Sequence, residues 1–323
     1  TRDELADRLV PDCELDAHGR RVFDYGRRQF SFVLTGDLKP MVRDEHGKLR
    51  ANPPQPGKLD DDVLAPQAYE GWKLLKKQVR ETAKVQAVRL EQALVSQRRW
   101  SGADFERFLV KQPLMIHLTR LLLWGAATAD GATRLFRVTE EQDYADVDDD
   151  ELLLDPSWQI GLVHPLALDG AVLSEWGELF SDYELVPPFP QLAREVYRLT
   201  AEEKGQLEWH GLAEAEINGR SLMSGLIGRG WERGYPQDAG MVYGHSKWFA
   251  QAGLTAVVEY EGLYIESPDW GNPQGIQRCF FVPRRYIPDY GYRGQDKIPL
   301  GDVDPLIVSE VWRDLYALAG KTS

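Results

Sequence analysis

The 323-residue sequence contains only two cysteines, Cys13 and Cys279, which lie far apart in the chain. Two distant thiols provide neither a disulfide framework nor the paired spacing of a zinc site, and they favour a reducing compartment. Long apolar runs are also missing, so the sequence predicts no membrane span. Its beginning lacks the charged and then apolar pattern of a secretion signal. We therefore expect a cytoplasmic protein, and because residue 1 is Thr rather than Met, we expect a piece of a longer polypeptide.

Motifs for catalysis and metal binding are equally scarce. The six histidines show no HExxH pattern, no G-x-S-x-G elbow is present, and residues 225–230 (GLIGRG) lack the lysine of a phosphate loop. The acidic residues 143–151 lack the glycine and the glutamate that a calcium loop carries at its sixth and twelfth positions. We interpret them as a solvated hairpin tip. The sequence thus predicts no metal and no cofactor, identifies no catalytic residue, and leans away from an enzyme.

One class of enzyme stays open as an alternative. ADP-ribosyltransferases hold NAD with a histidine, a tyrosine and a glutamate on successive strands. Here His210 is followed by Tyr243 or Tyr260 and by Glu259 or Glu266. Three common residue types occur in this order readily by chance, so the pattern is a weak indication of a nucleotide-using enzyme.

The dominant feature is an apolar repeat in residues 68–100. Its steps of three or four residues predict one long amphipathic helix. The apolar positions are Ala68, Trp72, Leu75, Val79, Ala83, Ala87, Leu90 and Leu94. The cations of the same stretch are Lys73, Lys76, Lys77, Arg80, Lys84 and Arg89, followed by Arg98 and Arg99 directly before Trp100.

This helix is basic in an acidic protein. Residues 71–100 hold eight Lys or Arg against two Glu, whereas the whole chain has a formal net charge of −13. The basic face is therefore either paired internally with the protein's own carboxylates or free to dock an anionic partner. Arg98, Arg99 and Trp100 combine positive charge with an aromatic ring, a pairing typical of nucleic-acid binding.

A second cationic and aromatic cluster comes from Arg229, Trp231 and Arg233, which glycines flank. We expect a compact loop there, and one interpretation is that its arginines clamp an anion bidentately. The alternative is a structural loop whose arginines pair with local acids and whose tryptophan packs inward.

The order of the predicted elements indicates an α+β fold. Residues 1–60 form a β-rich N-terminal segment that ends in the proline-rich connector 52–57, and residues 61–323 form the main domain with a sub-boundary near 186–190. A helical layer (about 63–127) packs with antiparallel or mixed β regions before and after it. The long helix begins either at residue 63 or at Pro66.

The boundaries of the other elements follow from periodicity and capping residues. We predict strands at 21–24, 29–34, 38–44, 133–139, 152–154, 159–163, 241–249, 255–264 and 277–282. We predict further helices at 101–110, 114–124, 174–180 and 191–199, and a C-terminal helix opened by Asp304 and Pro305.

Several blocks, taken in order, resemble a known bacterial family. They are residues 30–40 (FSFVLTGDLKP), 57–61 (GKLDD), 89–100 (RLEQALVSQRRW), 123–125 (LWG), 136–138 (FRV), 164–166 (HPL), 182–184 (DYE), 188–192 (PFPQL) and 230–234 (GWERG). In this order the blocks resemble the C-terminal, MolR-like domain of unknown function numbered 4132. This domain is found in bacterial proteins that often carry an N-terminal WGR module.

The resemblance implies a role but no chemistry. It implies a regulatory or scaffolding module, in a stress or defence system with a MoxR-type ATPase or a von Willebrand A protein as partner. WGR modules elsewhere bind nucleic acid, but this chain shows no WGR module, so that role does not transfer. The family supplies no catalytic residues. Direct nucleic-acid binding through residues 72–100 is the first alternative, and a nucleotide-using enzyme is the second.

Overall fold

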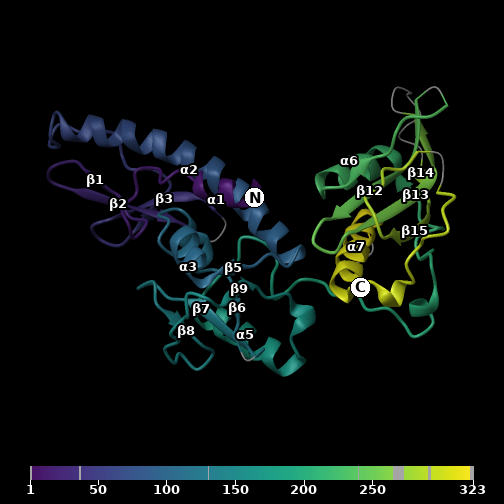
Figure 1. Ribbon diagram of the computed structural model, residues 1–323. Helices are drawn as coiled ribbons and strands as arrows, with labels where there is room; N and C mark the ends of the chain where they lie inside the picture. The colour runs from purple at the N-terminus through teal and green to yellow at the C-terminus, as the bar shows by residue number, and fades with distance from the viewer. Residues whose placement is uncertain are drawn as a thin grey trace. The chain divides into compact units, whose positions relative to one another are not determined.

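The computed structural model describes residues 2–35, 38–129, 131–238, 240–264, 273–289 and 292–320. The chain divides into two compact units, Thr1–Arg194 and Glu195–Ser323. Both units contain helices and antiparallel sheets, and this confirms the predicted α+β class (Figure 1). The predicted boundary at residue 60 lies inside the first unit, and the predicted sub-boundary at 186–190 precedes the start of the second.

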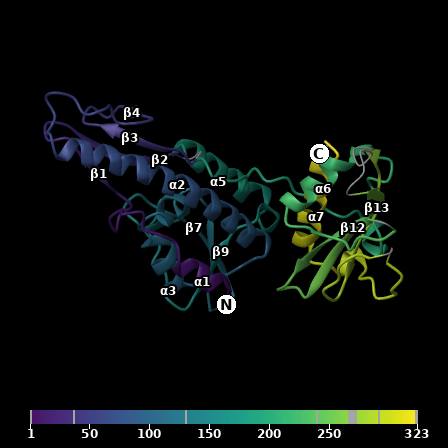
Figure 2. The same cartoon turned by 90° about the horizontal axis from the view of Figure 1, so that it is seen from above.

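The first unit is organised around helix α2 (Leu64–Val95), whose buried face spans two cores. Trp72, Leu75 and Val79 pack on an antiparallel meander of four strands, along which α2 lies in Figure 2. Leu90 and Leu94 belong to the second core. The meander consists of β1 (Val22–Asp24), β2 (Gln29–Leu34), β3 (Pro40–Asp44) and β4 (Leu49–Arg50). The long amphipathic helix and its core residues are thereby confirmed.

Local hydrogen bonds determine where α2 begins and ends. The Asp61 carboxylate accepts hydrogen bonds from the backbone N–H groups of Val63 (2.9 Å) and Leu64 (2.8 Å), so the helix starts before Pro66. At the other end Gln97 adopts a positive φ of 53°. Its N–H donates to the Leu94 carbonyl, and the next N–H donates to Ala93, which is the Schellman arrangement that ends helices. The helix therefore stops at Val95, and its predicted continuation to residue 100 is wrong.

The predicted helical layer is interrupted by strands. Helix α4 covers only Met115–Thr119, and strand β6 (Trp124–Ala127) occupies the end of the predicted helix 114–124. The Trp124 indole N–H donates to the Thr119 carbonyl (2.9 Å), which turns the chain into the strand. Strand β6 then pairs on both edges, so its apolar run is that of a central strand.

The second sheet of this unit has the order β5-β9-β6-β7-β8. Its other strands are β5 (Trp100–Ser101), β7 (Thr133–Val138), β8 (Tyr144–Ala145) and β9 (Gln159–Leu162). Ser101 caps α3 (Gly102–Phe105) as predicted, since its hydroxyl accepts from the Asp104 N–H at 3.1 Å. A π-helical turn (Glu106–Val110) continues α3. The remaining helices are α1 (Arg2–Arg8), a 3-10 turn (Pro165–Ala167) and α5 (Gly170–Asp182).

Two other predicted elements of the first unit are wrong. Residues 152–154 form no strand, although Glu151 makes an isolated bridge to Ala145. The predicted helix 191–199 is a turn followed by irregular chain, in which the buried Gln191 amide bonds with backbone at strand ends. Its oxygen accepts from the Leu123 N–H (2.9 Å), and its nitrogen donates to the carbonyls of Leu123 (2.8 Å) and Val163 (3.0 Å).

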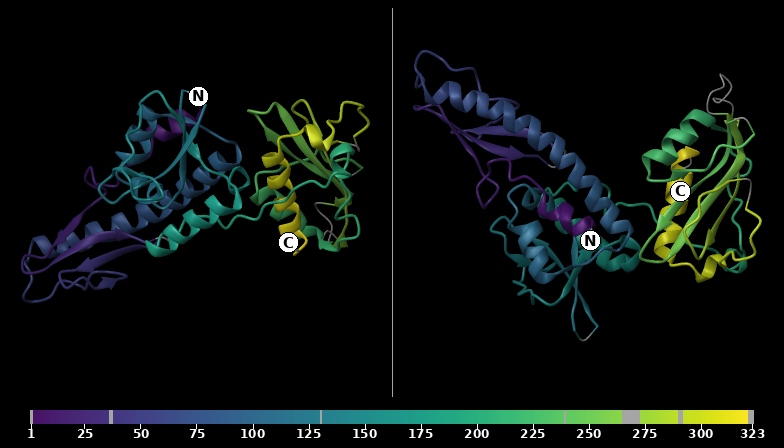
Figure 3. Two further views of the ribbon diagram at one scale, coloured as in Figure 1. Left: turned by 90° about the horizontal axis from the view of Figure 1, so that it is seen from below. Right: turned by 45° about the horizontal axis from the view of Figure 1, so that its top comes forward.

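The second unit is an antiparallel sheet, in the order β11-β12-β13-β15, with helices α6 and α7 on one face (Figure 3). Aromatic contacts fix that face: the Trp312 ring of α7 stacks on Phe281 of β15 and on Trp209. The strands are β11 (Glu232–Arg233), β12 (Met241–Phe249), β13 (Leu254–Tyr264) and β15 (Ile276–Val282). The helices are α6 (Gly219–Gly228) and α7 (Pro305–Leu318). A separate pair joins β10 (Ile217–Asn218) to β14 (Pro273–Gln274).

Capping side chains mark the starts of helical turns in this unit. Thr200 and Glu203 form the reciprocal hydrogen bonds of a capping box, here on a 3-10 turn (Glu203–Gly205). A second such turn covers Leu300–Asp302. Asp304 caps the C-terminal helix α7 by accepting from the Leu306 N–H. Among the described helices of the whole chain, none has the length and apolar character to cross a membrane.

Candidate functional site

The solvent face of α2 holds cations that differ in how they are paired. Lys73 forms an ion pair with Glu70 (2.7 Å), which raises the pKa of Lys73. Lys76 donates to the Asn52 side chain (2.8 Å) and is therefore tied to the connector. Lys77, Arg80 and Lys84 are exposed and make no ion pair or side-chain hydrogen bond with any described residue. Together with Lys73, these three form what we term the cationic edge of α2.

Beside the cationic edge lie exposed aliphatic side chains. Leu74, Val85 and Val88 are 55%, 57% and 54% exposed, respectively. We term these three the outer seam. Sequence reasoning missed them, although a signal existed: they fall opposite the buried positions of the same helical period.

The cations at the end of α2 are internal ties instead. Asp7 of α1 accepts from Arg98 (2.5 Å) and Arg89 (2.9 Å), and its second oxygen also accepts from the Trp100 indole N–H (3.0 Å). The Arg98 guanidinium lies over the Trp100 ring at 4.5 Å. Trp100 is buried, so its ring is closed to nucleobase stacking. Of the predicted group at this end, Arg99 alone is exposed.

The predicted loop around Arg229 is partly helical, because α6 extends to Gly228. Trp231 is only 3% exposed, and its indole N–H donates to the Asp314 carboxylate of α7 (2.9 Å). Lys247 donates to the same oxygen (2.8 Å), and the Arg229 Nε lies 3.9 Å from the other. Arg233 is exposed on β11. The tryptophan thus packs inward and an acid faces Arg229, as the structural alternative predicts.

The residues of the ADP-ribosyltransferase pattern are held in separate pairwise contacts, and His210 and Glu259 are linked only through Glu208 and Arg278. The Tyr260 hydroxyl bonds with His245 Nδ1 (3.0 Å), whereas Glu259 accepts from Arg278 Nε (2.6 Å). The Tyr243 hydroxyl donates to Asp238 (2.9 Å). His210 faces Glu208, and Glu266 lies outside the described residues.

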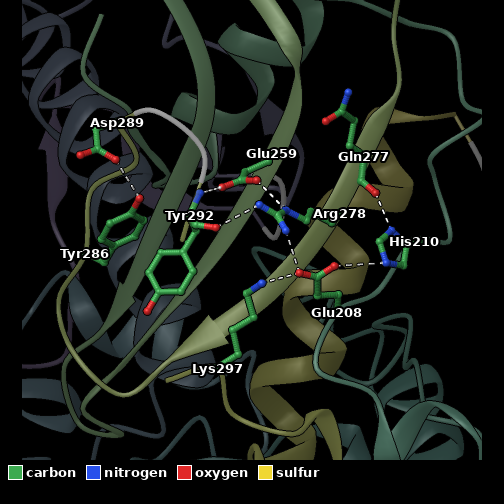
Figure 4. A network of polar contacts seen from close by, with 9 residues as sticks. All are labelled: Glu208, His210, Glu259, Gln277, Arg278, Tyr286, Asp289, Tyr292 and Lys297. Carbon is green, nitrogen blue, oxygen red and sulfur yellow. Dashed lines mark hydrogen bonds and ion pairs between the residues drawn. The ribbon is translucent and has the colours of Figure 1, made fainter. Parts of the chain in front are cut away.

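Figure 4 shows the polar network around Glu259 and Glu208 in the second unit. The buried Glu259 accepts from Arg278 and from the Tyr292 backbone N–H (2.7 Å). Arg278 also donates to Glu208 (2.8 Å), which Lys297 contacts as well. Burial acts to raise the pKa of Glu208, but these two cations lower it on balance. Each of the two carboxylates faces a cation. We therefore interpret the network as ion pairs that stabilise the second unit.

A polar cavity of about 240 Å³ beside the acidic hairpin is lined by Glu106, Asp143 and Glu151 among other residues. Among the described residues, no group of three His, Cys, Asp or Glu side chains is placed to hold a metal ion. The acidic hairpin tip is a turn in which the Asp146 carboxylate accepts from the N–H groups of Asp148 and Asp150 (both 3.0 Å). A groove of about 630 Å³ lies between α5 and residues 185–193, but no titratable side chain lines it.

His245 is a buried base that sequence reasoning did not single out. It is fully buried, Tyr260 contacts its Nδ1, and its Nε2 has no hydrogen-bond partner among the described residues. Burial, reinforced by the positive charge of Arg233, lowers the pKa of His245 from 6.5 to about 4. The folded unit therefore holds the neutral imidazole.

This burial predicts acid-sensitive stability in the second unit. The unfolded state takes up a proton on His245 near its ordinary pKa of 6.5, while the folded state resists until about pH 4. Its contribution is thus complete above pH 6.5 and is lost as the pH falls towards 4, by at most about 3 kcal/mol. Urea unfolding, followed by the second unit's tryptophans between pH 7 and 4, measures this slope. His245→Gln is expected to flatten it, and an unchanged slope would contradict the assignment.

Comparison with known proteins places the chain in a family. Its sequence is 35% identical over 241 residues to "Uncharacterized protein YehI" of Escherichia coli (strain K12), a match that covers 73% of this chain and 20% of that protein. The chain thus spans about a fifth of its relative's length. No solved structure matches the chain. The sequence profile of the family described as Domain of unknown function (DUF4132) matches residues 47–231, more than half of the sequence, and the chain belongs to this family.

Proposed function

We propose that this chain is a regulatory or scaffolding module of a bacterial MolR-like protein acting in the cytoplasm, and that it docks a protein partner on the outer face of α2. One observation carries the proposal: the unpaired cations Lys77, Arg80 and Lys84 lie beside the exposed outer seam. A surface that joins apolar contact area with positive charge suits a protein partner that carries acidic residues around an apolar patch.

The same observation favours a protein over a nucleic acid. Phosphates are bound by cations alone, and single strands add stacking on exposed aromatic rings. The two tryptophans that accompany arginines, Trp100 and Trp231, are both buried. The outer seam of Leu74, Val85 and Val88 has no use against a phosphate backbone. Nucleic-acid binding is therefore the alternative that the crosslinking experiment below distinguishes from protein binding.

The family resemblance suggests which partners to test first, namely a MoxR-type ATPase and a von Willebrand A protein encoded nearby. No enzyme activity is needed for this role. The polar network around Glu259 and the tie around Asp314 then serve to hold the second unit together, and they take no part in docking.

Photo-crosslinking in the native host tests the proposal. A benzophenone amino acid replaces Val85 in the protein that contains this chain, and Leu153, which is 79% exposed, provides the control position. We expect a discrete adduct from position 85 that protease removes and nuclease leaves intact. A nuclease-sensitive adduct would show that the partner is a nucleic acid and not a protein. Equal patterns from the two positions would overturn a docking role for α2.

A further inference from the structure

The outer seam and the cationic edge are arranged with the repeat of a helix-binding surface. Leu74, Val85 and Val88 are separated by eleven and three residues, which are close to three turns and to four fifths of a turn. They consequently form one line along α2, about 21 Å long. Gln78 and Glu81 lie between them on the same line and are exposed. The line follows alternating steps of four and three residues, which is the heptad pattern of packed helices.

The cations of the cationic edge all lie on one side of this line. At 100° per residue, Lys77 and Lys84 fall directly beside the outer seam, and Lys73 and Arg80 fall just behind them on the same side. The other side offers the uncharged Thr82 and then Arg89, which forms an ion pair with Asp7. In heptad terms Lys77 and Lys84 occupy equivalent flanking positions seven residues apart, where interhelical ion pairs select the partner.

We propose that the occupant of this surface is an amphipathic α-helix of the partner, with an apolar stripe against the outer seam and Asp or Glu residues along the edge that faces Lys77 and Lys84. This inference rests on the proposed function and specifies its partner. An extended peptide fits less well, because it gains affinity from backbone hydrogen bonds at a sheet edge, and the backbone of α2 is satisfied within the helix.

A second copy of the same helix is a poor occupant. Packed antiparallel, two α2 faces place their cationic edges against each other. Packed parallel, they set Lys77 and Lys84 opposite Thr82 and Arg89 of the copy, and among the described residues of the outer face only Glu81 and Glu70 are acidic. Glu70 is already paired with Lys73. Like charges across an interface suppress such pairing, so the acids must come from a different sequence.

A designed peptide provides the probe. It has three heptads, with Leu at the two core positions and Glu at the two flanking positions, and it is titrated into the purified full chain by fluorescence anisotropy. A scrambled peptide of the same composition removes the helical repeat, and a peptide with Lys in place of Glu reverses the charge. The chain carries either Lys77→Glu/Lys84→Glu or the matched pair Lys48→Glu/Lys58→Glu, which makes the same change in net charge at exposed positions away from the outer seam.

We expect the heptad peptide to bind, and binding to weaken at least about tenfold with Lys77→Glu/Lys84→Glu but not with Lys48→Glu/Lys58→Glu. The scrambled and the cationic peptides are expected not to bind. Equal binding of the scrambled peptide, or of the heptad peptide to both variants, would overturn the helical partner. So would a failure of all peptides while position 85 still crosslinks to a protein, and in that case the proposed function would stand. Loss of the crosslink itself would overturn the proposed function.

Discussion

Asp7→Ala is expected to lower the free energy of unfolding of the first unit by about 3 kcal/mol, which is a typical cost of removing one partner of a buried ion pair. Asp7 is 8% exposed and accepts hydrogen bonds from Arg89, Arg98 and Trp100. Without its carboxylate, the largely covered Arg98 guanidinium loses its counter-charge and Trp100 loses its acceptor. The contacts of Asp7 also join α1 to the C-terminal end of α2. The variant is therefore expected to let α1 detach from the rest of the first unit.

Urea unfolding measures the expected change, and hydrogen exchange at residues 2–8 reports the release of α1. Glu81→Ala is the matched control, since it removes an exposed carboxylate of α2 without a described contact. An Asp7→Ala midpoint equal to that of the control would show that Arg98 and Trp100 are not held by this tie. Their assignment as structural residues would then be wrong.

Asp314→Ala is expected to destabilise the second unit by about 3 kcal/mol or more. Asp314 is 5% exposed on α7, and its carboxylate joins Trp231 and Lys247 of different elements. Removing it leaves a covered ammonium and a buried indole N–H without their acceptor. Asp314→Asn keeps the shape and one acceptor oxygen, and we therefore expect an intermediate loss.

The loss is measured by thermal unfolding of the second unit, with Glu202→Ala as the control because Glu202 is exposed. Binding through α2 is expected to be unchanged in the Asp314 variants at temperatures where they are folded. If Asp314→Ala is as stable as the control, the cluster of Arg229, Trp231 and Asp314 is not a structural tie, and its role as a binding loop would be open again.

What could be predicted from the sequence is the part that local pattern determines. The three-and-four spacing of Trp72, Leu75 and Val79 predicts α2 because one face must be buried on the sheet. Alternation and turn residues likewise predict β12, β13 and β15 to within a few positions. Asp304 gives the start of α7 through a single capping hydrogen bond.

What could not be predicted depends on contacts between distant residues. An apolar run such as that ending at Trp124 fits a buried helix or a central strand equally well, and only its pairing with β7 and β9 decides. Gln191 bonds with Leu123, 68 positions earlier. Asp7 bonds with Arg98 across 91 positions, so no local signal separates this cation from the unpaired Lys77.

The cations of residues 71–100 differ in whether they are paired internally. Arg89 and Arg98 are tied to Asp7, and Lys76 is tied to Asn52. Lys77, Arg80 and Lys84 have no such partner among the described residues. The unpaired cations thus lie on the same side of α2 as the exposed aliphatic residues of the outer seam. This shared location supports the proposed docking.

The yield of the position-85 crosslink in a charge-reversed chain tests the docking surface most directly. Lys77→Glu/Lys84→Glu reverses two unpaired cations of the cationic edge, and substitution of these exposed side chains leaves the cores packed on α2 intact. The proposed docking predicts a crosslink yield at least about tenfold lower than in the Lys48→Glu/Lys58→Glu chain, with the same urea midpoint in both. An equal yield in the two chains would contradict a role for the outer face of α2 in binding the partner.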